Sequence, residues 1–121
     1  MVFAKNFEDL EVFKLAFKNS LKIHKATLNF PKTEQFELAS QLRRCTKSIC
    51  ANIAEGFGKQ VTSKAEYKRF LNMALGSCSE TRLWLRYCFE LGYINKNDYL
   101  EYREFYLQIG KMLTKLKTNS K

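Results

Sequence analysis

The chain of 121 residues carries a formal net charge of +9, is 45% hydrophobic and contains only 5 Gly and 1 Pro. This length fits one domain (residues 1–121), the hydrophobic content excludes a disordered chain, and so little Gly and Pro argues against many short strands. Because no apolar run reaches the roughly 20 residues that cross a membrane, and no signal peptide is recognisable, we expect a cytoplasmic protein without a membrane partner.

The first predicted helix spans residues 7–29 and ends at Phe30-Pro31, because the residue before a proline avoids helical geometry. Its inward face is predicted to consist of Leu10, Phe13, Phe17, Leu21, His24 and Leu28. We interpret His24, the single histidine, as a core or core-edge residue rather than a ligand or a base. A second stripe consists of Lys14, Lys18, Lys22 and Lys25. No acid interrupts this stripe, so it is either a solvated face or a rail for phosphate groups.

The second predicted helix spans residues 34–57, with Thr33 as its N-cap and with Gly56 and Gly58 ending it. Its apolar face consists of Leu42, Thr46, Ile49, Ile53 and Phe57. A second face consists of Arg44, Ser48, Ala51, Asn52 and Glu55. Its small polar side chains leave room for another backbone, which indicates a contact surface. Two alternatives stay open: the polar residues contact a second subunit, or they satisfy the end of the helix within one subunit. The residues concerned are Ser48, Asn52, Glu55 and Gly56.

The third predicted helix spans residues 64–91 and the fourth spans residues 96–117. Ser63 fits the first position of a capping box, Gly92 fits a left-handed C-terminal cap, and Asn95 fits the next N-cap. The inward face of the third helix is predicted to consist of Tyr67, Phe70, Leu71, Ala74, Cys78, Thr81, Leu85, Cys88 and Phe89. That of the fourth is predicted to consist of Tyr99, Tyr102, Phe105, Tyr106, Ile109, Met112, Leu113 and Leu116.

Four helices joined by short loops predict an all-α fold, an antiparallel up-down-up-down four-helix bundle. Apolar residues on the third and fourth helices spread past the single stripe that a monomeric bundle hides. This excess predicts self-association into a homo-oligomer.

The sequence offers no set of residues suited to catalysis, and we expect neither an enzyme nor a bound cofactor or metal. The cysteines Cys45, Cys50, Cys78 and Cys88 form no Cys-x-x-Cys pair, so they are predicted to be reduced thiols in the core or an interface. The single histidine leaves a nucleophile without an obvious base. Glu55, the only acid between Glu37 and Glu66, is predicted to be an ionic partner rather than a general base.

The positive charge is spread evenly along the chain and forms no basic tail. Acids precede bases within the predicted helices, which suits the helix macrodipole but does not explain the surplus. A uniformly basic small protein usually meets a polyanion or an acidic protein. The candidate phosphate contacts are Lys14, Lys18, Lys22, Lys25, Arg43, Arg44, Lys47, Arg82 and Arg86. Because the aromatic residues are predicted to face mostly inward, we expect contact with the nucleic-acid backbone rather than base stacking.

Several segments carry a resemblance to a known family. They are FEDLEVFKLA (Phe7 to Ala16), Phe30-Pro31-Lys32, SQLRR (Ser40 to Arg44), Ser48-Ile49, NIAEGFGK (Asn52 to Lys59) and Leu91-Gly92-Tyr93. Together they resemble the four-helix-bundle proteins of the 23S rRNA intervening-sequence family. That family's relatives include the accessory variability determinants of diversity-generating retroelements. The chain departs from the family pattern at Cys50, often Pro there, at Lys59, often Arg, and at Thr46 and Lys47, where small apolar residues are usual.

The resemblance implies a small bacterial bundle that forms a barrel-like homopentamer. For the retroelement relatives it implies binding of nucleic acid and of a reverse transcriptase partner through a basic surface, without catalysis. Two functions therefore remain open for this chain. It is either an accessory or scaffold protein that binds RNA or DNA, or a structural oligomer whose basic surface receives an acidic protein partner.

Overall fold

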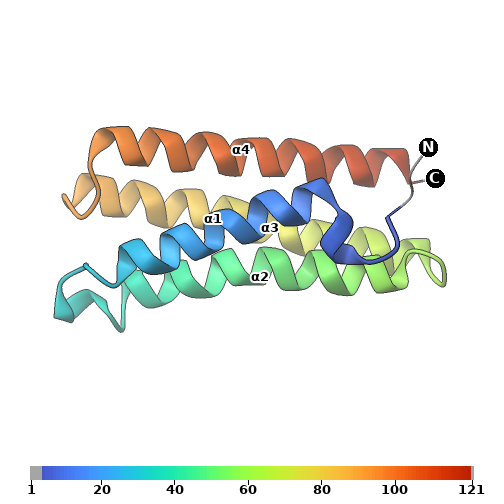
Figure 1. Cartoon of the computed structure of the whole chain (residues 1–121), viewed down its shortest axis with the longest axis horizontal. Coiled ribbons are helices and arrows are strands. Elements are labelled where there is room, and N and C mark those ends of the chain that lie inside the picture. Colours follow the sequence, from blue (N-terminus) through green and yellow to red (C-terminus); the bar gives the residue numbers. More distant parts are fainter. Residues whose placement is uncertain (1–3, 121) are drawn as a thin grey trace.

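Four long helices lie side by side in the computed structural model, which describes residues 4–120 (Figure 1). They are α1 (Glu11–Thr27), α2 (Leu38–Lys59), α3 (Lys64–Glu90) and α4 (Lys96–Asn119), with 3-10 turns η1 (Phe7–Asp9) and η2 (Lys32–Glu34). Each helix begins at the end of the molecule where the preceding one stops. No strand occurs within residues 4–120. The predicted all-α bundle of four helices is therefore confirmed, while the outermost residues of the predicted domain, 1–3 and 121, lie outside the described part.

The caps of the third and fourth helices follow the prediction. The Ser63 hydroxyl accepts a hydrogen bond from the Glu66 amide at 3.2 Å, and Asn95 Oδ1 accepts one from the Asp98 amide at 2.8 Å. Gly92 has a φ of 81°, and the amide of the following residue, Tyr93, donates to the Cys88 carbonyl at 2.8 Å. This is a Schellman cap, for which a residue without Cβ is best suited.

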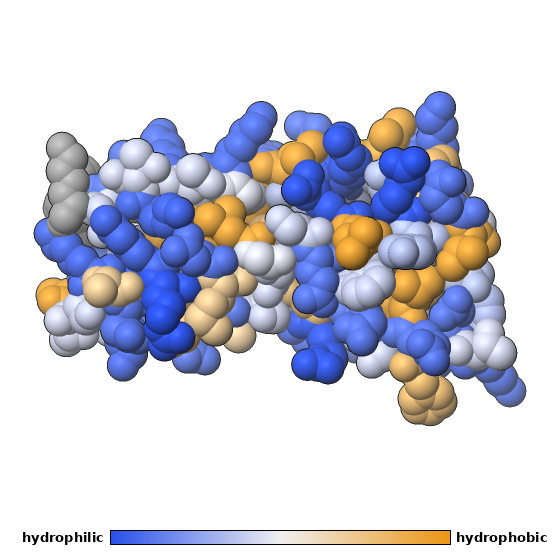
Figure 2. All heavy atoms as spheres, turned by 180° about the vertical axis from the view of Figure 1, so that it is seen from behind, coloured by the Kyte–Doolittle hydropathy of each residue, from blue (hydrophilic) through white to orange (hydrophobic). Residues whose placement is uncertain are grey.

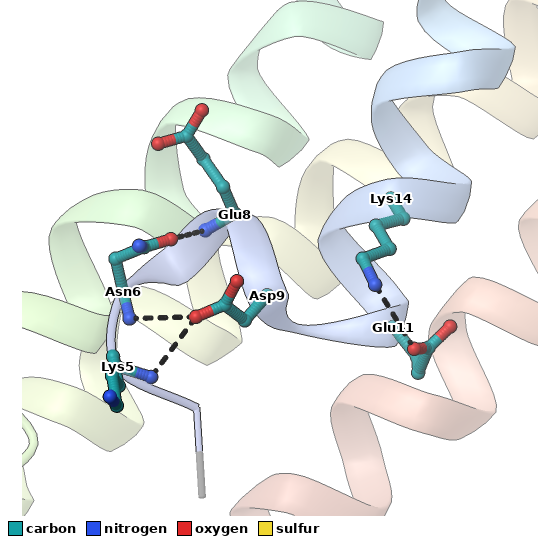
Figure 3. A network of polar contacts seen from close by, with 6 residues as sticks. All are labelled: Lys5, Asn6, Glu8, Asp9, Glu11 and Lys14. Atoms are coloured by element: carbon teal, nitrogen blue, oxygen red, sulfur yellow. Dashed lines mark hydrogen bonds and ion pairs between the residues drawn. The ribbon is translucent and has the colours of Figure 1, made fainter.

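The predicted start of the first helix is wrong. A 3-10 turn precedes α1 because two side chains near the N-terminus bond reciprocally with the backbone (Figure 3). Asn6 Oδ1 accepts from the Glu8 amide at 2.9 Å, and Asp9 Oδ2 accepts from the Asn6 amide at 3.3 Å. Leu10 then leaves helical geometry with a ψ of 130°, so the α-helix begins only after it.

The predicted start of the second helix, with Thr33 as its cap, is also wrong. Lys32–Glu34 form a 3-10 turn, and α2 begins at Leu38. Hydrogen bonds of Gln35 hold the connection in a conformation that does not continue into α2. The Gln35 side-chain amide donates to the carbonyls of Thr27 at 2.8 Å and Phe30 at 3.1 Å, which ties the connection to the end of α1.

The largest correction concerns the face that α1 buries. The predicted inward stripe is wrong at Phe17, Leu21 and Leu28, which are 48%, 45% and 61% exposed. Leu10 and Phe13 are partly buried and pack against the core as predicted. The buried residues are instead Val12, Ala16, Asn19, Ser20, Ile23 and Thr27. Small side chains let α1 come close to its neighbours. The hydroxyls of Ser20 and Thr27 each donate to a carbonyl of their own helix at 2.7 Å, and Asn19 Nδ2 donates to one at 2.9 Å. The buried Asn19 Oδ1 has no hydrogen-bond partner among the described residues.

The inward faces of α3 and α4 agree much better with the prediction. On α3, every predicted inward position is buried except Phe89, which is half-buried and packs against the core. On α4, Tyr99, Tyr106, Ile109 and Leu113 are buried, and the other predicted positions are partly exposed. Within the described residues no helix is long and apolar enough to cross a membrane.

The predicted end of α2 at Phe57 is wrong, because the helix continues through both glycines to Lys59. Gly56 is buried beneath α3, where an added Cβ would lie 3.0 Å from the Cβ of Phe70. Gly58 is exposed, and a Cβ there would meet nothing within 4 Å. Gly56 therefore permits the close approach of α2 and α3 rather than ending the helix.

This difference predicts opposite effects for the same substitution at the two glycines. Gly56→Ala should destabilise the fold by about 1 kcal/mol or more, because the crowding against Phe70 outweighs the gain in helix propensity. Gly58→Ala should stabilise it by about 0.5–1 kcal/mol, because only the propensity term acts there. Urea denaturation of both variants measures the two values. Stabilisation by Gly56→Ala would contradict the close contact.

Candidate nucleic-acid interface

The lysine stripe of α1 lies exposed on the outside of the bundle, and two of its members are paired. Lys14 Nζ lies 3.4 Å from Glu11 Oε1 (Figure 3). Lys22 Nζ lies 3.6 Å from Glu101 Oε1 of α4. Such exposed pairs contribute only about 0–1 kcal/mol, so both lysines stay available to a stronger anion. Lys18 and Lys25 form no ion pair with any residue in the described part of the chain.

Arg43, predicted as a phosphate contact, braces the connection between α1 and α2. Its Nη1 donates to Thr27 Oγ1 at 2.9 Å and to Gln35 Oε1 at 3.2 Å. Its Nη2 donates to the Gln35 carbonyl at 3.0 Å. The guanidinium is therefore held in place by neutral partners, and its charge is not neutralised by them. Its neighbour Arg44 is fully exposed on the outer side of α2.

Lys47 reaches from α2 to the histidine of α1. Its Nζ lies 2.8 Å from His24 Nδ1 and 3.5 Å from the carbonyl of Arg43. An ammonium group only donates hydrogen bonds, so His24 Nδ1 must accept, and the neutral imidazole carries its proton on Nε2. The sequence predicts His24 in the core or at its edge. The structure places it half-exposed in the α1–α2 seam, against a lysine.

Positive neighbours keep His24 neutral. The Lys47 ammonium is the main cause that lowers the pKa of His24 below its ordinary value, followed by burial and by the Arg43 guanidinium. The pKa of Lys47 is itself lowered by burial and by Arg43. We call His24, Arg43 and Lys47 the α1–α2 cationic cluster. In it, positive neighbours lower the pKa values of His24 and Lys47.

An apolar groove lies on the same side of the molecule, one turn of α1 before the cluster. It encloses about 310 Å³ and is lined by Phe13, Phe17, Ser20, Leu21, Lys47, Cys50, Ala51 and Ala54. The rings of Phe13 and Phe17 stack with their centroids 5.6 Å apart. Most aromatic side chains of the described residues are buried or half-buried as predicted, but Phe17 in this groove, Phe36 and Tyr87 are exposed.

The other predicted phosphate contacts lie elsewhere. Arg82 lines a groove of about 380 Å³ between α3 and α4, and Arg86 Nε pairs with Glu90 Oε1 at 3.2 Å. Both arginines belong to α3, and within residues 4–120 no Cα atom of α3 lies within 8 Å of a Cα atom of α1. The structure therefore divides the nine predicted basic residues into an α1–α2 group and a separate α3 pair.

The polar stripe of α2 is engaged mainly within the chain. Ser48 Oγ accepts from Ser77 Oγ of α3 at 3.0 Å and from Asn52 Nδ2 at 3.1 Å, and Asn52 Nδ2 also donates to the Ser48 carbonyl at 2.9 Å. Gly56 faces α3 as well, whereas Glu55 is exposed. Ser48, Asn52 and Gly56 are thus engaged within the chain, in mid-helix rather than at the helix end. Contact of this face with a second subunit stays a prediction.

The cysteines are free thiols without the character of nucleophiles. Burial raises the pKa of Cys45 and Cys50 to about 11 and that of Cys78 and Cys88 to about 12, so all four thiols stay protonated near neutral pH. No group of three or more His, Cys, Asp or Glu side chains that could hold a metal ion occurs within residues 4–120.

Comparison with known proteins places the chain in a family. Residues 8–115 match the family model described as 23S rRNA-intervening sequence protein. A similar solved structure is that of a protein with unknown function from the S23 ribosomal protein family of Bacteroides thetaiotaomicron. It has a TM-score of 0.80 and 26% sequence identity, and the match covers 89% of this chain and 96% of that chain. No curated protein matches. The chain therefore belongs to the 23S rRNA-intervening sequence protein family.

Proposed function

We propose that this protein is a non-enzymatic accessory or scaffold protein that binds the phosphate backbone of RNA or DNA through α1 and the first half of α2. The observation that carries the proposal is the concentration of uncompensated positive charge on that side. Lys18 and Lys25 of α1 are exposed without an ion pair, and the α1–α2 cationic cluster lies beside them. A surface of this kind attracts a polyanion and gives affinity without sequence readout.

The proposal includes self-association into a barrel-like homo-oligomer, for which a pentamer remains our expectation. The apolar groove between α1 and α2 is one unpartnered surface. A second is an apolar ridge on α3, formed by the half-exposed residues Leu83, Tyr87 and Leu91 at helical spacing. Figure 2 shows the side of the molecule on which α3 lies, where orange apolar patches separate the polar side chains.

A groove and a ridge on different sides of one chain favour a head-to-tail contact. The ridge of one copy would enter the groove of the next, and contacts of this type close into rings. A ring would repeat the basic side of each subunit, and the net charge of +9 per chain would act many times on one strand. Lys18 and Lys25 lie about a quarter of a turn around α1 from the groove residues Phe13 and Phe17, so a copy seated in the groove need not cover them. Lys47 belongs to both surfaces.

Charge reversal tests the nucleic-acid site. The double variant Lys18→Glu/Lys25→Glu should lower the affinity for single-stranded RNA at least about tenfold and reduce the salt slope by about two, because two phosphate contacts are lost. Fluorescence anisotropy over a range of salt concentrations measures both. Lys64→Glu/Lys111→Glu, with the same charge change on α3 and α4, is the matched control and should bind nearly as the parent does.

Equal losses in both double variants would remove α1 from the site. Failure of the parent protein to bind either RNA or DNA at low salt would overturn the proposed function. It would favour the alternative, a structural oligomer with an acidic protein partner.

The oligomer contact has its own test. Phe17→Ser should reduce the particle mass measured by light scattering, because Phe17 lines the groove that the ridge of the next copy would fill. Phe36→Ser is the matched control, because Phe36 is 92% exposed in the connection between α1 and α2 and is not part of the lining of this groove. An unaltered particle mass for Phe17→Ser would contradict the proposed contact between the ridge of one copy and the groove of the next.

A further inference from the structure

The α1–α2 cationic cluster has hydrogen-bond donors that no described residue of the chain uses. The Lys47 ammonium donates one N–H to His24 Nδ1 and a second, at 3.5 Å, to the carbonyl of Arg43. Its third N–H has no partner among the described residues. The neutral imidazole of His24 presents its Nε2–H, for which the described chain supplies no acceptor. Nε2–H points away from Lys47, so the place where donors from both helices can meet is between Lys47 Nζ and His24 Nδ1, next to the fixed guanidinium.

The nearby carboxylates do not neutralise this cluster. Glu34 Oε2 accepts a hydrogen bond from the Tyr93 hydroxyl at 2.7 Å. Glu101 of α4 pairs with Lys22 on another side of α1. Among the described residues, the charges that act on His24 are those of Lys47 and Arg43, both from α2 and both positive. A site that brings cations together without an acid is complementary to an anion from outside the chain.

We propose that His24 and Lys47 form an oxyanion site that takes a phosphate group, with Arg43 as the fixed charge behind it. The group is a phosphodiester of the nucleic-acid backbone or a free phosphate. The first source rests on the proposed function, whereas the second does not. Arg43 acts as a positioning residue, because three of its five N–H donors are already bonded to Thr27 and Gln35.

Binding at this site takes up a proton. Without an anion, Lys47 and Arg43 disfavour the imidazolium form of His24. A bound oxyanion favours that form, since both ring nitrogens then donate and Lys47, released from Nδ1, can turn to the anion. The pKa of His24 is thus higher in the complex than in the free protein. By linkage, the affinity rises as the pH falls from the pKa of His24 in the complex toward its pKa in the free protein, which lies below the ordinary value of 6.5.

The single histidine makes this measurable without assignment. The ring signals of His24 are followed by NMR from about pH 5 to 8 in the untagged protein. Three samples are compared: protein alone, protein with sulfate, which keeps its charge over this range, and protein with decauridylate. We expect both ligands to raise the titration midpoint, by about one pH unit for a tenfold preference for the imidazolium form.

The outcomes separate the site from the proposed function. A raised midpoint with sulfate but no binding of decauridylate supports the oxyanion site and overturns the nucleic-acid function. A raised midpoint with decauridylate alone supports a backbone phosphodiester as the ligand. Binding of decauridylate with an unchanged midpoint in both ligand samples overturns this inference and leaves the proposed function standing.

A pair of variants checks the geometry. In the absence of ligand, Lys47→Gln should raise the His24 midpoint, because the main cause of its low pKa is removed. The further rise on adding sulfate should then shrink. Lys64→Gln, with the same charge change at the start of α3, should leave both values as in the parent. A full sulfate response in Lys47→Gln would exclude Lys47 from the site.

Discussion

The orientation of α1 about its own axis determines what the rest of the molecule presents to solvent. This helix packs a narrow face of small and self-satisfied polar residues, such as Ala16 and Ser20, against the bundle. The larger apolar residues Phe17 and Leu21 are left half-exposed as a consequence. His24 is turned to the α1–α2 seam, and the lysine stripe is turned outward. The apolar groove, the cationic cluster and the basic surface therefore all depend on one packing choice.

Arg43 stabilises this orientation of α1 at the C-terminal end of the helix. Its guanidinium joins α2 to Thr27, the last residue of α1, and to Gln35 in the connection. The guanidinium loses part of its hydration when it bonds to three neutral acceptors. In return it forms hydrogen bonds that are each stronger than a hydrogen bond between two neutral groups. The same brace holds a positive charge close to His24 and Lys47, so one residue both fixes the seam and tunes the electrostatics of the proposed site.

The sequence predicted the second half of the molecule better than the first, and for a physical reason. Ser63, Gly92 and Asn95 act through local hydrogen bonds or local dihedral angles, which a sequence reveals directly. In α1, two stripes at helical spacing compete for burial. The stripe with the larger side chains looks like the core, but the close approach of neighbouring helices selects the smaller one. Gly56 was predicted to end the helix for the same kind of reason. A glycine is needed there because α2 comes close to Phe70 of α3, and the helix continues past it.

The basic residues were identified from the sequence, but their grouping was not. The position of Arg82 and Arg86 on a separate helix, and the contact of Lys47 with His24 across 23 residues of chain, are tertiary facts. Charge counting could not show that Arg43 is engaged internally while Arg44 is free to reach solvent. The proposed function depends on the contacts between α1 and α2, and the hydrophobic periodicity of either helix does not predict those contacts.

The central claim, that nucleic acid binds along α1 and the start of α2, is tested most directly by ultraviolet cross-linking of bound oligouridylate, followed by mass spectrometry of the modified peptides. The account predicts adducts on peptides from residues 11–27 and 38–47. Adducts confined to α3 and α4 would contradict it.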